Sequence, residues 1–143
     1  MRRKLIMGSG SAGYQKTIGA RSEAMHSALQ SLKAGMDNGK VTSSMYSGVI
    51  SKLPKNPEEL KNYGWKEITN PSKKVNRPGS LDFKDTSTDL TVNFDKGENG
   101  APGNRGKDHY HVLNPNRTGK DDYYLDKDGK PCRKGSPASH IKV

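Results

Sequence analysis

The chain has 143 residues, of which 29% are hydrophobic, and it carries a net charge of +10. This length suits one small domain, and the sequence contains no run of about 18 apolar residues that would predict a membrane anchor. Cys132 is the only cysteine, which excludes an internal disulfide and a zinc site built from cysteines.

The positive charge is spread unevenly along the chain. Residues 1–55 hold nine Lys and Arg against two acidic residues, whereas residues 56–143 hold sixteen against thirteen. A basic protein of this size favours a polyanionic partner, because contacts to phosphates supply most of the non-specific affinity for nucleic acid. Solubility explains the same charge, so the charge favours nucleic acid but does not single it out.

The first 55 residues predict a leader and two helices. Residues 1–18 are basic and rich in Gly and Ser, and we expect them to be a disordered leader. Apolar residues recur at helical spacing over residues 20–34 and again over residues 43–53, where Pro54 ends the pattern. Residues 19–55 are therefore predicted to be a helical linker or delivery segment.

Residues 56–143 are predicted to be the functional domain. Asn56 can cap a short helix that Pro57 opens and Gly64 ends. Beyond residue 80 the hydrophobic period changes to two, which is typical of half-buried strands. Helices followed by such a meander indicate an α+β fold, with N-terminal helices and then a twisted antiparallel sheet of four to five strands.

Three of the four histidines fall within the last third of the chain. On a strand, His109 and His111 project from the same face. Two imidazoles side by side on a polar face are poorly explained by packing, and their near-neutral pKa suits proton transfer. His140, which follows Ser139, either closes onto this strand or remains exposed in a frayed tail.

These residue types predict cleavage of RNA without a metal ion. The reaction needs a base for the 2′-hydroxyl proton, an acid for the leaving 5′-oxygen and a cation for the pentavalent phosphate. His111 and His140 are predicted to be the acid–base pair, with His109 as a further partner and Lys107 as the cation. The Asp-rich stretch 121–128 lacks the spacing of a calcium loop, so we expect no metal site and no cofactor.

Five ordered segments of the sequence carry a resemblance to a known family. They are Gly64–Ile68, Leu90–Gly97, Asp108–Val112, Tyr124–Asp126 and Ser139–Ile141. Together they resemble the C-terminal toxin domains of bacterial polymorphic toxins, of the contact-dependent inhibition, Rhs and LXG types. The resemblance covers residues 56–143 and implies a ribonuclease of the fold shared by barnase, EndoU, colicin and RelE nucleases.

The resemblance also implies roles and partners. His109, His111 and His140 would be catalytic, assisted by Ser139 and Lys107. We expect the RNA substrate to be contacted by Arg105, Lys134, Ser136 and Asn114. The family further implies delivery from the producing bacterium, cleavage of tRNA or rRNA in the cytoplasm of the target cell, and an acidic immunity protein that plugs the site.

Two other functions fit parts of the sequence. A metal-dependent DNase of the His-Asn-His kind is suggested by the pair His109 and His111 with Asn114, but residues 115–143 show no helical period for the later ligand. A basic nucleic-acid-binding protein without enzymatic activity would explain the charge and leave the histidines incidental.

Overall fold

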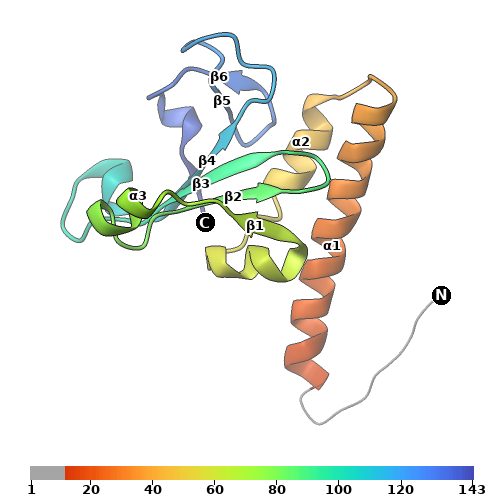
Figure 1. Cartoon of the computed structure of the whole chain (residues 1–143), viewed down its shortest axis with the longest axis horizontal. Helices are drawn as coiled ribbons and strands as arrows, with labels where there is room; N and C mark the ends of the chain where they lie inside the picture. Colours follow the sequence, from red (N-terminus) through yellow and green to blue (C-terminus); the bar gives the residue numbers. More distant parts are fainter. Residues whose placement is uncertain (1–11) are drawn as a thin grey trace.

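The computed structural model describes residues 12–143, with side chains from residue 22 onward, and it confirms the α+β class (Figure 1). Two helices come first, α1 (Ala12–Asp37) and α2 (Ser43–Ile50). Residues 1–11 of the predicted leader lie outside the described residues, and α1 begins at Ala12, inside the segment predicted to be a leader. No helix in the described part of the chain is both long and apolar enough to cross a membrane.

Seven antiparallel strands form one sheet, where four to five were predicted. They are β1 (Trp65–Glu67), β2 (Leu81–Asp85), β3 (Thr91–Asp95), β4 (His109–Leu113), β5 (Tyr124–Leu125), β6 (Pro131–Cys132) and β7 (Ile141–Lys142). The strand order is β1-β2-β3-β4-β5-β6, and β7 pairs with β4. The strands that were not predicted, β1, β6 and β7, are two or three residues long, which is too short to display a hydrophobic period.

Four short helices connect these elements: η1 (Pro57–Tyr63), α3 (Pro71–Asn76), η2 (Gly103–Gly106) and η3 (Pro137–Ser139). The first begins as predicted, because the side chain of Asn56 accepts a hydrogen bond from the amide of Glu58 at 3.1 Å. It ends at Gly64, whose φ of 93° lies in the left-handed region that favours glycine.

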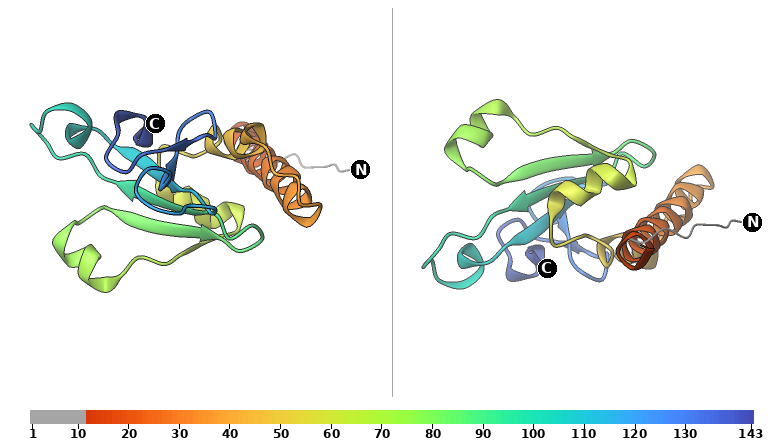
Figure 2. Two further views of the ribbon diagram at one scale, coloured as in Figure 1. Left: turned by 90° about the horizontal axis from the view of Figure 1, so that it is seen from above. Right: turned by 90° about the horizontal axis from the view of Figure 1, so that it is seen from below.

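One face of the sheet packs against the helices, and we call it the core face. It carries Phe83, Val92, Phe94, Tyr110 and Val112, none of which is more than 2% exposed. Apolar side chains of α1, α2 and η1 belong to the same hydrophobic cluster, and Figure 2 shows η1 lying across the sheet with α1 beside it. The opposite face, which we call the polar face, carries Asp82, Asn93, Asp95, His109, His111 and Tyr124.

The predicted boundary before residue 56 does not separate two cores. Met25 of α1 and Val49 of α2 are fully buried in the cluster that the sheet also forms. In addition, the hydroxyl of Tyr110 on β4 donates a 2.7 Å hydrogen bond to the carbonyl of Pro54. An amphipathic pattern shows that a helix must bury one face, but it does not show which surface covers that face.

Candidate functional site

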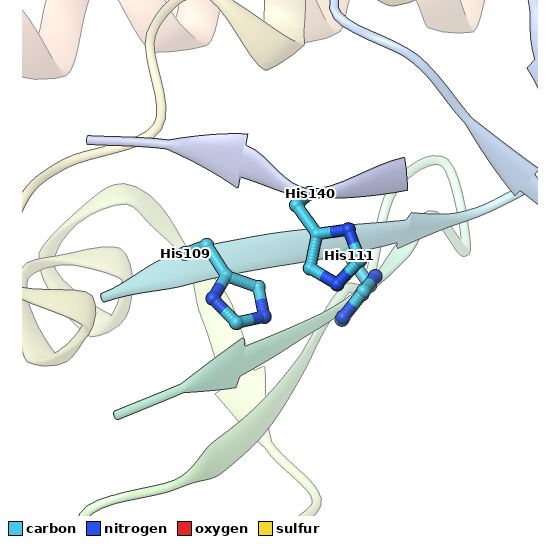
Figure 3. Close-up of side chains that lie close together, drawn as sticks. All are labelled: His109, His111 and His140. Carbon is cyan, nitrogen blue, oxygen red and sulfur yellow. The ribbon is translucent and has the colours of Figure 1, made fainter. Parts of the chain in front are cut away.

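Strand pairing brings three histidines together on the polar face (Figure 3). His109 and His111 lie on β4, and β7 runs beside the start of β4 with Lys142 opposite His109. This pairing places His140, the residue before β7, against the other two. Its ring centroid lies 4.7 Å from each of theirs, and their own centroids are 4.9 Å apart.

Two backbone carbonyls determine where hydrogen sits on two of the rings. Nδ1 of His109 lies 2.9 Å from the carbonyl oxygen of Lys107, and Nδ1 of His140 lies 2.9 Å from that of Ser136. A carbonyl oxygen only accepts hydrogen bonds, so both Nδ1 atoms must carry a hydrogen. The atoms left to gain or lose a proton are therefore Nε2 of His109 and Nε2 of His140.

Asp95 at the end of β3 supplies a negative charge to the cluster. Its Oδ2 lies 3.4 Å from Nε2 of His109 and 3.3 Å from Nε2 of His111. Burial alone would raise the pKa of this carboxyl, but the two histidines and the charge of Arg77 hold the pKa far below its usual range. Asp95 is therefore a permanent anion at neutral pH.

The surroundings displace the pKa values of His109 and His140 in opposite directions. Burial of His109 favours the neutral ring, but Asp95 and the carbonyl of Lys107 outweigh it, so the pKa rises above 6.5. Burial of His140, reinforced by positive charge on His111 and His109, lowers its pKa below 6.5. Two groups whose pKa values are separated in one site are suited to act as an acid and a base.

His111 has a different environment from the other two histidines. Its Nδ1 is buried and has no hydrogen-bond partner among the described residues. Its ring stacks on Tyr124 of β5, with centroids 4.7 Å apart and planes inclined by 28°. The plane of this ring is therefore held by packing, while its Nε2 faces Asp95.

The three histidines line a pocket of about 170 Å³. The other lining residues are Arg77, Asp95, Lys96, Glu98 and Arg105. Lys96 pairs with Asp108 at 3.3 Å and Arg105 pairs with Glu98 at 2.9 Å. Arg77 makes no ion pair with a described residue, so it is the cation best placed to take a phosphate.

A larger hollow of about 610 Å³ adjoins this pocket and shares only His140 with it.

Arg77 and Asp95 were missed by the sequence analysis. Asp95 was detectable, because it continues the polar alternation of Thr91 and Asn93 along a strand whose other face is apolar. Arg77 lies in the segment between α3 and β2, and its approach to the histidines depends on tertiary folding. No local pattern in the sequence marks it.

Three residues predicted to act on the substrate make hydrogen bonds that position the histidines. Lys107 contributes its backbone carbonyl to His109, while its side chain is exposed and does not line the pocket. Ser139 is fully buried, and its hydroxyl donates to the carbonyl of Ser136 at 2.7 Å. Ser136 in turn accepts from His140 through that same carbonyl. The turn at η3 thus holds His140 in place.

Asn114 and Lys134 lie away from the histidine pocket. Asn114 is 3% exposed, and its side chain donates to the carbonyl of Asp122 at 2.8 Å and accepts from the amide of Asn116 at 3.0 Å. It therefore stabilises the loop after β4. Lys134 is exposed and lies over the ring of Tyr123 at 4.6 Å.

Among the residues that the structure describes, the same three histidines form a group that could hold a metal ion. One nitrogen from each of His109, His111 and His140 lies within 4.8 Å of the other two. Three imidazoles are the number of protein ligands found in some catalytic zinc sites. The hydrogen bonds from Nδ1 of His109 and His140 to carbonyls are also typical of the outer shell of such sites.

The chain was compared with known protein families, curated proteins and solved structures. None of them matches it.

Proposed function

We propose that this protein is an endoribonuclease that cleaves RNA by acid–base catalysis without a metal ion. The observation that carries the proposal is the pair His109 and His140, whose Nδ1 atoms donate to carbonyls and whose pKa values are displaced in opposite directions. The surroundings therefore favour the imidazolium form at His109 and the neutral ring at His140. One pocket then holds a proton donor and a proton acceptor.

The proposed reaction has two coupled proton transfers. Nε2 of His140 takes the proton of a ribose 2′-hydroxyl, and the 2′-oxygen forms a bond to the adjacent phosphorus. The bond from phosphorus to the 5′-oxygen of the next nucleotide breaks, and Nε2 of His109 gives that oxygen its proton. The products are a 2′,3′-cyclic phosphate and a free 5′-hydroxyl.

The pentavalent phosphate gains negative charge as it forms, and Arg77 is proposed to stabilise it. Arg77 is exposed and lines the histidine pocket, and the planar donors of a guanidinium match phosphate oxygens. This assigns to Arg77 the role that the sequence analysis gave to Lys107. It also replaces His111 by His109 as the partner of His140, and leaves His111 to orient the phosphate and Asp95.

We further propose that the nuclease is an antibacterial toxin delivered to other bacteria, where it cleaves tRNA or rRNA in the cytoplasm. The support is the resemblance of residues 56–143 to polymorphic toxin domains and the net charge of +10. A free ribonuclease would harm its producer, so we propose an acidic immunity protein, which a basic surface attracts efficiently. That protein would cover the histidine pocket.

A metal-dependent nuclease is the second candidate, because three histidine nitrogens converge within 4.8 Å. The His-Asn-His kind is disfavoured, however. Its later ligand sits on an α-helix after the hairpin, and residues 114–143 contain only short strands and η3. Asn114 is also bound into its own loop.

Incubation of the full chain with total RNA in excess EDTA tests the first candidate against the second. We expect cleavage with 2′,3′-cyclic phosphate ends, detected by end-specific ligation and sequencing. Activity that appears only after Zn²⁺ or another divalent ion is added, with 5′-phosphate products, would transfer the proposal to the metal nuclease. Binding of RNA without any cleavage in either buffer would favour a non-enzymatic nucleic-acid-binding protein.

A further inference from the structure

Aromatic rings lead away from the histidine pocket along the start of β5. Tyr124 stacks on His111 with centroids 4.7 Å apart, and Tyr123 meets Tyr124 edge-on at 4.9 Å. Both tyrosines are partly exposed. Proteins that bind single strands combine such rings, which stack on bases of any identity, with cations that contact the backbone.

Two cations lie against Tyr123, the ring of this series that is furthest along from His111. The guanidinium of Arg117 lies 5.3 Å from the centroid of the Tyr123 ring, and Nζ of Lys134 lies 4.6 Å from it. Neither cation forms an ion pair with a described residue. The neighbouring Arg133, in contrast, lies 3.7 Å from a carboxylate oxygen of Asp121. The charges on Arg117 and Lys134 are therefore available to a ligand.

Two acidic residues of this region are held by hydrogen bonds within their own loops, and neither forms an ion pair with Arg117 or Lys134. Asp122 accepts from the amides of Thr118 and Gly119 at 2.8 and 3.0 Å. Asp126 accepts from the amides of Asp128 and Lys130 at 2.9 and 3.0 Å. These bonds turn the acidic groups toward their own backbone.

Hydrogen bonds also fix the segment that presents the cations. Asn114 binds the carbonyl of Asp122 across the loop after β4, and the guanidinium of Arg117 donates to the carbonyl of Asn114 at 3.1 Å. The amide of Lys134 donates to the carbonyl of Lys120 at 2.8 Å, which ties the two cation-bearing segments together. A surface that is held in place before binding loses less entropy when a ligand arrives.

We propose that Arg117, Tyr123 and Lys134 form a second subsite, which binds the phosphate backbone of single-stranded RNA beside the cleavage point. The proposal rests on the function proposed above, since it takes RNA as the substrate of the histidine pocket. The strand would pass from the pocket over the edge of Tyr124 to the cations.

The test measures binding of a fluorescent single-stranded DNA hexamer to the full chain by anisotropy, over a range of NaCl concentrations. DNA lacks the 2′-hydroxyl, so it reports binding without cleavage. In the double variant Arg117→Gln/Lys134→Gln, the slope of log affinity against log salt should fall by about 1.4, and affinity at 0.1 M should fall roughly 10- to 30-fold. The matched control Lys40→Gln/Lys52→Gln changes two exposed lysines of the helical region and should leave both quantities unchanged.

The two proposals fail in different ways. If the double variant binds the hexamer as tightly and with the same slope as the parent, the subsite is wrong, whatever the cleavage assay shows. The parent protein could fail to cleave RNA while binding of the hexamer still depends on Arg117 and Lys134 as expected. The subsite would then stand as a single-strand binding site, and the ribonuclease proposal would be wrong. Equal losses in the control variant would show non-specific charge attraction and would also overturn the subsite.

Discussion

The two faces of the sheet use the same strands for different purposes. On β3 and β4, the core face carries Val92, Phe94, Tyr110 and Val112, which are almost completely buried. On the polar face of the same two strands, Asp95 lies beside His109 and His111. Because neighbouring side chains of a strand point to opposite faces, substitutions one residue apart should fail in different ways.

The largest expected effect is on cleavage, at His140. Replacing it with Ala removes the proposed base, so the rate of RNA cleavage should fall by roughly 10²- to 10⁴-fold. The midpoint of urea unfolding should change little, because the imidazole lies on the polar face. The control His26→Ala removes an exposed histidine of α1 and should change neither quantity. A folded His140→Ala variant that cleaves within tenfold of the parent would contradict the acid–base pair.

The core face should show the converse behaviour. Phe94→Ala leaves a cavity under the sheet and should lower the free energy of unfolding by about 3–5 kcal/mol. Its neighbour Asn93 lies on the polar face and donates a 2.7 Å hydrogen bond to Asp82, so Asn93→Ala should cost about 1 kcal/mol. Urea unfolding measures both changes. The milder Phe94→Leu serves if Phe94→Ala does not fold, and equal costs at the two positions would break the distinction between the faces.

The alternation of apolar and polar residues along the strands explains why much of the fold was predictable from sequence. Leu90, Val92 and Phe94 display the period of a strand, and Asn56 and Gly64 display the ends of a short helix. The position of His109 and His111 on one strand face follows from the same alternation. In contrast, the packing of α1 and α2 on the sheet depends on which surfaces meet, and no local pattern encodes that.

Only the part of the candidate site whose residues are close together in the sequence was predictable. Nothing in the sequence around His140 states that β7 pairs with β4, since a two-residue strand has no period. The hydrogen bonds of Lys107 and Ser139 were not predictable for a related reason. Both residues act through hydrogen bonds that position a histidine, and residue type alone suggested direct contact with substrate. Arg77 reaches the pocket from a distant segment, so only the fold reveals it.

The substitution Asp95→Asn tests whether the polar face of the sheet acts through charge, in contrast to the apolar core face. Asp95 raises the pKa of His109 by stabilising the imidazolium, so Asp95→Asn should lower that pKa. The rate of cleavage should be bell-shaped in pH, with its acidic limb below 6.5 set by His140 and its alkaline limb above 6.5 set by His109. In the variant the alkaline limb should move to lower pH and the bell should narrow.

The same substitution has a consequence for stability that can be measured independently. A raised pKa of His109 contributes stability below 6.5 that is lost as the pH rises through the higher folded value. Asp95→Asn should remove this pH dependence, and NMR titration of the His109 ring should show the lower pKa directly. Asp82→Asn is the matched control, since Asp82 shares the polar face but pairs with Lys73. An unchanged His109 titration in Asp95→Asn would contradict the role given to Asp95.

The smallest expected effect on cleavage comes from Tyr110, which lies between the two histidines of β4 but on the core face. Its hydroxyl donates to the carbonyl of Pro54, and burial raises its pKa, so it remains a donor at every pH of the cleavage assay. Tyr110→Phe leaves that carbonyl without its donor and should cost about 1–3 kcal/mol of unfolding free energy.

The control for Tyr110→Phe is Tyr123→Phe, whose hydroxyl lies on a partly exposed ring and should matter by less than about 0.5 kcal/mol. Cleavage by the folded Tyr110→Phe variant should equal that of the parent, because the ring remains and β4 keeps its pairing with β3 and β7. If cleavage fell while the unfolding midpoint held, the hydroxyl would be acting on the histidines through the strand. A residue of the core face would then affect catalysis on the polar face. In that case, stability and catalysis would not be divided between alternate residues of β4.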